Sequence, residues 1–202
     1  MQVEPGLKRQ VSLLQIAVPS RGKIAAYRQL KTELETLVGE VNGRHSDVDW
    51  TPIRYLNKGF AQSTLAGFYR TAQVGLVTPL QDGMNLVAKE YVAAQNPSDP
   101  GVLVLSEFAG AAKELDTALL VNPHDIDSMA QKISTALNMS LEERRERWDV
   151  MIDRLRAGSV QGWFSDFVRA LAEVRRAALP VPVRSFSPVP LDQAERSMAH
   201  TR

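Results

Sequence analysis

Cysteine is absent from this chain, and its absence excludes several kinds of chemistry. The 202 residues contain no Cys, so disulfides, thiolate zinc sites and cysteine nucleophiles are ruled out. Long apolar runs are also missing, since no stretch approaches the roughly 20 residues that cross a bilayer. Neither sign of charge dominates, because 24 Lys and Arg offset 23 Asp and Glu. With so little net charge we expect no nucleic-acid and no membrane partner. The lack of cysteine is compatible with a reducing cytoplasm, and we expect a cytoplasmic location.

What the chain does contain is a regular alternation of short apolar runs and helical patterns. Hydrophobic residues make up 44% and charged residues 23% of the sequence, as in ordinary globular domains. We interpret five apolar runs as strands: 11–18, 53–56, 74–77, 102–105 and 118–121. Helical apolar spacing over 23–41, 63–71 and 84–95 separates the first four of them. This alternation predicts an α/β fold of the Rossmann-like kind, with a parallel sheet and helices on both faces.

The composition also predicts how the chain divides. We expect a disordered lead-in over residues 1–10, one domain with C-terminal helices over 11–178, and a flexible Pro-rich tail over 179–202. The last helix carries the widest apolar stripe, around Trp163 and Phe167. Such a stripe normally packs in a core. If it faces a missing domain, it is exposed in the isolated chain and favours a homo-oligomer or poor solubility.

The turn after the third strand is the main candidate site. Asp82 and Glu90 flank the Gly83-Met84-Asn85 turn and the start of the next helix. Helix N-terminal N–H groups bind phosphate or sugar oxygens, a glycine allows close approach, and carboxylates accept hydrogen bonds from hydroxyl groups. Spacing alone nevertheless favours a capped helix with Asp82 as the cap and Glu90 on a solvated face, because short motifs often match by chance.

Sites in parallel sheets lie beyond the carboxyl ends of the strands. We therefore expect four loops to converge: 20–22, 57–60, 78–85 and 107–112. The three histidines, His45, His124 and His200, have no metal-ligand spacing, so no metal and no cofactor is expected.

Several motifs occur in one order along the chain, and together they resemble a known family. They are Ser20-Arg21-Gly22, Trp50-Thr51-Pro52, Tyr55-Leu56-Asn57, the run 74–80, the run 82–91, and the run 101–106 with 108–112. From about Leu13 to about Val174 the sequence resembles the C-terminal half of the trehalose-6-phosphate synthase family. This resemblance reverses the preference for a simple capped helix.

The resemblance implies a retaining glycosyltransferase of the GT-B type, in which this half is the Rossmann-like domain that holds UDP-glucose. The reaction transfers glucose to glucose 6-phosphate and releases UDP, with no metal and no enzyme nucleophile. Asp82 resembles the catalytic-site carboxylate that holds the donor glucose. The other donor-site residues that the resemblance implies are Phe60, Gly83, Met84, Asn85, Leu86, Val87, Ala88, Lys89 and Glu90.

Within that site the resemblance gives separate roles. Glu90 is expected to accept the ribose hydroxyls, the backbone near Leu86 and Val87 to meet the diphosphate, and the Phe60 backbone to contact uracil. Arg21 resembles the arginine that reaches the phosphate of glucose 6-phosphate, as an arginine fork can. Taken singly, a lone arginine is more often solvated and a lone phenylalanine more often packed. Lys89 is expected to face solvent or a nearby carboxylate.

One part of the family pattern is missing from this sequence. An upstream segment resembling V-E-R-L-D-Y-S-K-G carries the arginine and lysine that neutralise the diphosphate, and neither it nor the acceptor domain occurs here. Removing fixed charge-stabilising groups costs several kcal/mol of barrier, so we expect the isolated chain to be inactive. Three alternatives remain: a half completed by an acceptor-domain chain, a non-catalytic partner of a full-length synthase, or the donor domain of another nucleotide-sugar transferase.

Overall fold

The computed structural model describes residues 5–19, 24–158 and 160–177. The chain divides into two compact units, Met1–Ile152 and Asp153–Arg202. The expected tail, 179–202, lies outside the described residues, and the domain limits stay predictions. Residues 5–10 were expected to be disordered, but they form the 3-10 helix Pro5–Leu7 and a turn. Lys8 pairs with Asp47 at 3.3 Å and Arg9 with Asp49, and these ion pairs tie the turn to the loop before β2.

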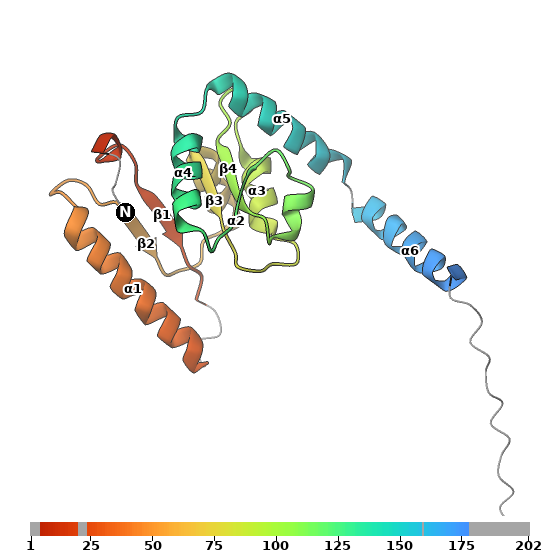
Figure 1. The fold of residues 1–202 in the computed structure, drawn as a ribbon, viewed down its shortest axis with the longest axis horizontal. Helices are drawn as coiled ribbons and strands as arrows, with labels where there is room; N and C mark the ends of the chain where they lie inside the picture. Colours follow the sequence, from red (N-terminus) through yellow and green to blue (C-terminus); the bar gives the residue numbers. More distant parts are fainter. Residues whose placement is uncertain (1–4, 20–23, 159, 178–202) are drawn as a thin grey trace, which may run out of the picture. The chain divides into compact units, whose positions relative to one another are not determined.

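The first unit is built from strands that alternate with helices (Figure 1). Every described strand pairing is parallel, which confirms the α/β class. The elements in chain order are β1 (Leu13–Ile16), α1 (Ala25–His45), β2 (Ile53–Leu56), α2 (Gln62–Thr71), β3 (Val74–Val77), α3 (Leu86–Ala94), β4 (Val102–Ser106), the 3-10 helix Gly110–Lys113, β5 (Leu119–Val121), α4 (Ile126–Leu137) and α5 (Leu141–Ala157), whose last residues belong to the second unit. In the part of the chain that the structure describes, no helix has the length and apolar character to cross a bilayer.

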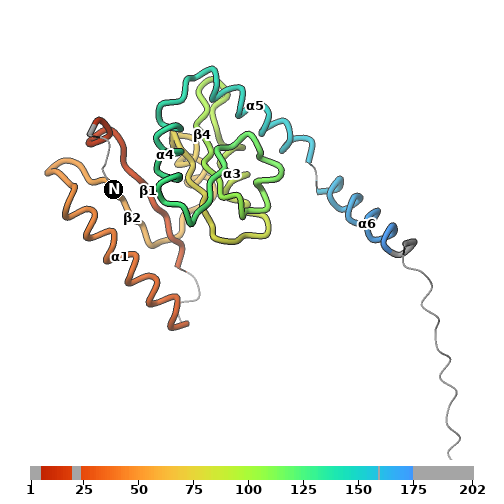
Figure 2. The backbone as a smooth tube through the Cα atoms, viewed as in Figure 1, coloured from red at the N-terminus to blue at the C-terminus, as the bar shows by residue number. Residues whose placement is uncertain are grey.

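The strands form two sheets. β1 pairs with β2 in register from Leu13 with Ile53 to Ile16 with Leu56. The other sheet has the order β3-β4-β5. The parallel strands β1 and β2 follow one another along the chain with α1 between them (Figure 2), the strand–helix–strand connection that Rossmann-like folds use.

The hydrophobic core lies around β4. All five residues of β4 are buried, as expected for a strand covered on both faces. Val102 and Val104 pack in one cluster with Leu119 and Val121 of β5 and with residues of and after α4, Ala136 and Met139. The run at 11–18 was expected to be one strand of the sheet. Only Leu13–Ile16 is a strand, and Leu13 and Leu14 are each 40% exposed.

Asn42 has a different role from the one that its sequence context suggests. Asn42-Gly43 has the composition of a helix stop, but α1 continues to His45. The Asn42 side chain donates to the Ile53 carbonyl at 2.9 Å and accepts from the Ile53 N–H at 3.1 Å. The amide therefore links α1 to the start of β2.

Tyr91 of α3 gives a prediction for stability against pH. Its hydroxyl donates to the Ala72 carbonyl at 3.0 Å and the ring is only 2% exposed. Burial raises the pKa of Tyr91 above its ordinary value of 10.0. The native state therefore keeps this proton at pH values where the unfolded chain has lost it. The contribution of Tyr91 to the free energy of unfolding is fully present below pH 10 and decreases as the pH rises further.

We expect Tyr91→Phe to lower the free energy of unfolding by about 1 kcal/mol at pH 7, because one buried hydrogen bond is lost. Above pH 10 the variant should lose stability less steeply than the parent chain. Urea denaturation from pH 7 to pH 11 measures both effects. Parallel pH profiles for the two proteins would contradict the assignment.

The second unit contains α6 (Val160–Ala177). Its apolar stripe is exposed, with Trp163 at 63% and Phe167 at 48%. The two rings stack with centroids 5.4 Å apart. The exposure agrees with the expectation from the sequence, and the self-association that it favours stays a prediction.

Candidate functional site

The turn between β3 and α3 is held by its own side chains. The Asp82 carboxylate accepts hydrogen bonds from the Met84 N–H at 3.1 Å and from the Asn85 side-chain amide at 3.0 Å. Asn85 caps α3 by accepting from the Ala88 N–H at 2.9 Å. Asn85 has φ 76°, a conformation that asparagine tolerates better than most residues. The turn is thus fixed before any ligand arrives.

The loops after β3 and β4 meet along their backbones. Asp82 N–H donates to the Phe108 carbonyl at 3.2 Å, and Gly110 N–H donates to the Asp82 carbonyl at 2.9 Å. Ala111 N–H donates to the Met84 carbonyl at 2.7 Å. The convergence expected of these two loops is confirmed, and it places Asp82 at the carboxyl ends of the strands, where sites in parallel sheets lie.

The glycine that permits this approach is Gly110. A Cβ atom at Gly110 would lie 2.1 Å from the Gly83 carbonyl oxygen, whereas a Cβ at Gly83 would have nothing within 4 Å. The close approach of a ligand to Gly83 stays a prediction. The short distance at Gly110 is between two loops, and it depends on which residue of the β4 loop faces the turn.

The N-terminus of α3 has the features of an anion site. Leu86 and Val87 lie in its first turn, where the N–H groups have no helical carbonyl as partner. Both side chains are exposed, at 61% and 44%, and the neighbouring Met84 is 47% exposed. First-turn amides of this kind bind phosphate oxygens and are favoured by the helix dipole.

Glu90 lies on the α2 side of α3 and lines a hollow of about 240 Å³. The other residues that line it come from α2 and the end of α3: Gln62, Leu65, Ala66, Tyr69, Ala93 and Ala94. Burial, and then the charge and hydrogen bond of Glu90, raise the pKa of Tyr69. A carboxylate has about four acceptor positions, so Glu90 can hold Tyr69 and still accept from a ligand.

Tyr69 is not among the residues predicted from the sequence. Nothing in the spacing between Tyr69 and Glu90 indicates that they meet, because the contact depends on how α2 packs against α3. Asp82 does not line the Glu90 hollow. The two predicted carboxylates therefore lie at two places along one segment, one before α3 and one in its second turn.

The side chains of three other predicted residues are buried, paired or packed within the protein. Ala88 is fully buried, so only its backbone can meet a ligand. Lys89 pairs with Glu114 at 2.7 Å, the nearby carboxylate that was expected for it. The Phe60 ring packs edge-on against Phe68 with centroids 5.3 Å apart, which leaves the backbone for the uracil contact that the resemblance implies.

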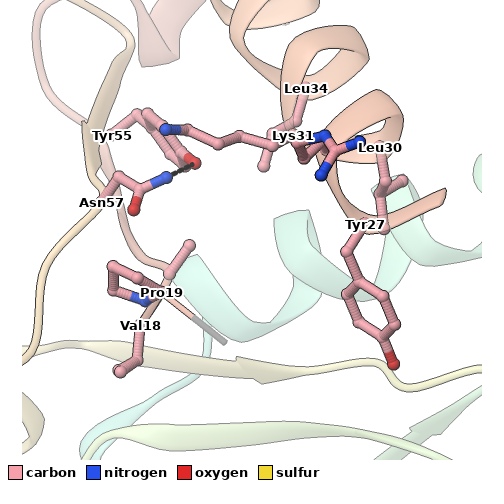
Figure 3. Close-up of a pocket in the computed structure, with 10 residues that line it drawn as sticks. Val18, Pro19, Tyr27, Leu30, Lys31, Leu34, Tyr55 and Asn57 are labelled. Carbon is pink, nitrogen blue, oxygen red and sulfur yellow. Dashed lines mark hydrogen bonds between the residues drawn. The ribbon is translucent and has the colours of Figure 1, made fainter. Parts of the chain in front are cut away.

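A second hollow, of about 560 Å³, lies where β1 and β2 end (Figure 3). Val18 and Pro19 follow β1, Tyr55 and Asn57 come from β2 and its end, and Lys31 reaches from α1 towards Tyr55. The Asn57 amide donates to the Tyr55 hydroxyl at 3.0 Å. Arg21, expected at the phosphate of glucose 6-phosphate, lies outside the described residues.

Comparison with known proteins identifies the family. The family described as Glycosyltransferase family 20 matches residues 1–173 of this chain. The chain belongs to glycosyltransferase family 20. A trehalose-6-phosphate synthase of Sinorhizobium fredii is 52% identical over 167 residues, which make up 83% of this chain and 36% of that protein. The resemblance stated from the motifs is thereby confirmed.

Solved structures of family 20 synthases have the same fold. An α,α-trehalose-phosphate synthase from Burkholderia xenovorans, in complex with glucose-6-phosphate, is 53% identical with a TM-score of 0.80. The match covers 83% of this chain and 37% of that one. An Escherichia coli protein bound with UDP-2-fluoro glucose is 48% identical with a TM-score of 0.80, over 83% of this chain and 37% of its own. This family 20 chain therefore spans little more than a third of the relatives that it matches.

Proposed function

We propose that this chain is the donor-binding half of a UDP-forming trehalose-phosphate synthase, which holds UDP-glucose for transfer of glucose to glucose 6-phosphate. The observation that carries the proposal is the fixed Asp82–Asn85 turn at the N-terminus of α3. In this turn a carboxylate, which can accept from sugar hydroxyls, lies next to first-turn amides, which can bind phosphate. The family 20 relatives of the chain include a protein bound with UDP-2-fluoro glucose, which supports the proposal.

The chemistry assigned to each residue follows from its position. Asp82 accepts hydrogen bonds from the glucose hydroxyls, and Gly83, Met84 and Asn85 offer backbone groups to the sugar. The amides of Leu86 and Val87 receive the diphosphate, whose negative charge grows as UDP leaves. Glu90 accepts the ribose hydroxyls and the Phe60 backbone meets uracil. Arg21 binds the acceptor phosphate, and the acceptor attacks from the face that UDP leaves, so configuration is retained.

Alone, the chain is expected to bind UDP-glucose weakly and to show no synthase turnover. The limited share of the relatives that it covers supports the lack of turnover. Its expected location is the cytoplasm. The same observation supports the second candidate, a non-catalytic partner of a full-length synthase. UDP release after mixing with a separate acceptor domain distinguishes the two: turnover indicates a split enzyme, whereas association without turnover indicates the partner role.

The binding proposal predicts different effects for the two carboxylates. We expect Asp82→Asn to weaken UDP-glucose binding about tenfold and UDP binding less, because only UDP-glucose carries the sugar that Asp82 meets. We expect Glu90→Gln to weaken both ligands by about the same factor, because Glu90 meets the ribose that they share.

Titration calorimetry with UDP-glucose, UDP, GDP-glucose and ADP-glucose measures these effects and the nucleotide preference. Glu142→Gln, in the exposed first turn of α5, is the matched control and should leave all affinities unchanged. No heat with either UDP or UDP-glucose would overturn the proposal, and equal loss of both ligands in Asp82→Asn would overturn the role of Asp82.

A further inference from the structure

The loop between β2 and α2 is anchored at several points along its length. Asn57 begins it and donates from its side-chain amide to the Tyr55 hydroxyl at 3.0 Å. At Gly59 an added Cβ atom would meet the Val18 side chain at 3.8 Å, so the loop lies beside the segment that follows β1. The loop ends at Ala61, the N-cap residue of α2. It therefore lies at the carboxyl ends of β1 and β2, where ligands bind in parallel sheets.

The Phe60 ring contacts one side chain of its own loop and one of α2. The ammonium nitrogen of Lys58 lies 5.0 Å from the centroid of the Phe60 ring, a distance at which a cation is attracted to the face of an aromatic ring. The Phe68 ring of α2 packs edge-on against the same ring, with centroids 5.3 Å apart. The two contacts together hold the Phe60 side chain against the helix.

The main chain of Phe60 is free to meet a ligand. Neither its N–H nor its C=O group makes a hydrogen bond with any residue that the structure describes. Backbone groups of a half-buried residue are normally paired with protein, water or a ligand. Phe60 thus combines a fixed side chain with one donor and one acceptor that are open to a partner.

A single N–H and C=O pair can distinguish the two pyrimidines. Uracil has a carbonyl acceptor at O4 next to the N3–H donor, and the two match an N–H and a C=O of the protein. Cytosine has an amino donor at N4 next to an N3 acceptor. In the same position its groups oppose donor to donor and acceptor to acceptor.

This discrimination depends on how firmly the loop is held. Cytosine can also satisfy an N–H and C=O pair, but only if the base and the backbone shift along one another. A site built to hydrogen-bond one ligand rejects another because its polar groups are then left unpaired. A loop that is fixed prevents the shift, whereas a looser loop permits it.

We propose that Lys58 is a positioning residue for the nucleobase: by holding the Phe60 ring against α2, it fixes the Phe60 N–H and C=O groups for uracil and against cytosine. The proposal rests on the proposed function, from which it takes the base contact of Phe60, and adds the residue that sets the base preference. Lys58 is itself exposed and acts through Phe60, without a contact to the nucleotide.

Titration calorimetry with UDP and CDP tests this role. Lys58→Met keeps an apolar side chain of similar length and removes the charge. We expect it to lower the preference for UDP over CDP about threefold, the size of an exposed cation–π contact. UDP and CDP carry the same diphosphate, so a direct attraction between Lys58 and the phosphates cancels in this ratio. Equal weakening of both ligands would show such an attraction instead and overturn the proposal.

Two further variants serve as controls. Lys58→Arg keeps a cation that can lie over the ring and should keep the preference of the parent chain. Lys132→Met removes one positive charge from α4 and should leave both affinities unchanged. A loss of preference in Lys58→Arg as large as that in Lys58→Met would show that the cation over Phe60 is not the cause, and would overturn the proposal.

NMR tests the contact without any nucleotide. The ring current of Phe60 should move the resonances of the terminal Lys58 methylene protons upfield, because the ammonium group lies over the ring. Phe60→Leu removes the ring and should abolish this shift, while the free energy of unfolding shows whether the variant is folded. Lys58 resonances at their ordinary positions in the parent chain overturn the proposal.

The parent chain separates this role from the function on which it rests. If it binds neither UDP nor CDP, the proposed function is overturned and the role of Lys58 with it. If it binds UDP and CDP equally, the proposed function stands and the base recognition is overturned. If it prefers UDP and Lys58→Met keeps that preference, the role of Lys58 alone is overturned.

Discussion

Gly101→Ala is expected to lower the free energy of unfolding by about 3 kcal/mol, the upper part of the range for overpacking a core. A Cβ atom at Gly101 would lie 2.1 Å from the Tyr91 hydroxyl and 2.6 Å from the Ala72 carbonyl oxygen. The Gly101 N–H also donates to the buried Gln95 side chain at 2.8 Å. The added methyl group therefore has to displace backbone as well as a tyrosine that carries a buried hydrogen bond.

Thermal and urea denaturation measure the loss, which should lower the melting temperature by about 10 °C for a chain of this size. The control is Gly67→Ala in α2, where a Cβ atom meets nothing within 4 Å. That variant should gain about 0.5–1 kcal/mol, because alanine has the higher helix propensity. If both variants have the stability of the parent chain, the packing around Tyr91 is not as described.

Gly110→Ala is expected to weaken UDP-glucose binding about a hundredfold, the effect of a misplacement of roughly 1 Å in a site. Its Cβ atom would lie 2.1 Å from the Gly83 carbonyl oxygen and 3.3 Å from the Met84 Cα. Both are backbone atoms, so the β3 and β4 loops have to move apart. The Ala111–Met84 hydrogen bond of 2.7 Å should then open, and the Asp82 turn loses its support.

Calorimetry measures the affinity, and hydrogen exchange at the Gly110 and Ala111 amides measures the separation of the loops even where no ligand binds. Gly43→Ala in α1, where a Cβ atom also meets nothing within 4 Å, is the control and should leave both readings unchanged. Parent-like exchange at both amides in Gly110→Ala would show that the two loops are not joined in this way.

Much of the candidate site could be predicted before the structure, although for two different reasons. The strand, the turn and the start of α3 follow from local patterns: an apolar run, a turn with Asp, Gly and Asn, and a helical stripe from Leu86. The assignment of UDP-glucose to this turn came only from the family resemblance, because the spacing of Asp82 and Glu90 by itself favoured a capped helix. The assigned residue roles await the binding experiments.

The residues missed or misassigned share one property, which is that their partners are distant in the sequence. Tyr69 meets Glu90 across α2 and α3, and Gly110 meets Gly83 across two loops. Lys89 was expected to face solvent or a nearby carboxylate, and the carboxylate that it meets, Glu114, lies 25 residues away in the sequence. Asn42 has the local composition of a helix stop, whereas its amide bonds to Ile53 in β2.

The sequence by itself determined the α/β class, the order of strands and helices, and the family, because hydrophobic periodicity and short motifs act through neighbours along the chain. Only the tertiary structure decided that the described strands form two sheets, β1-β2 and β3-β4-β5, and that Gly110 permits the loops after β3 and β4 to meet. The physical reason is that pairing and close approach depend on which surfaces come together in space. An apolar strand has the same sequence whether its neighbour is present or not.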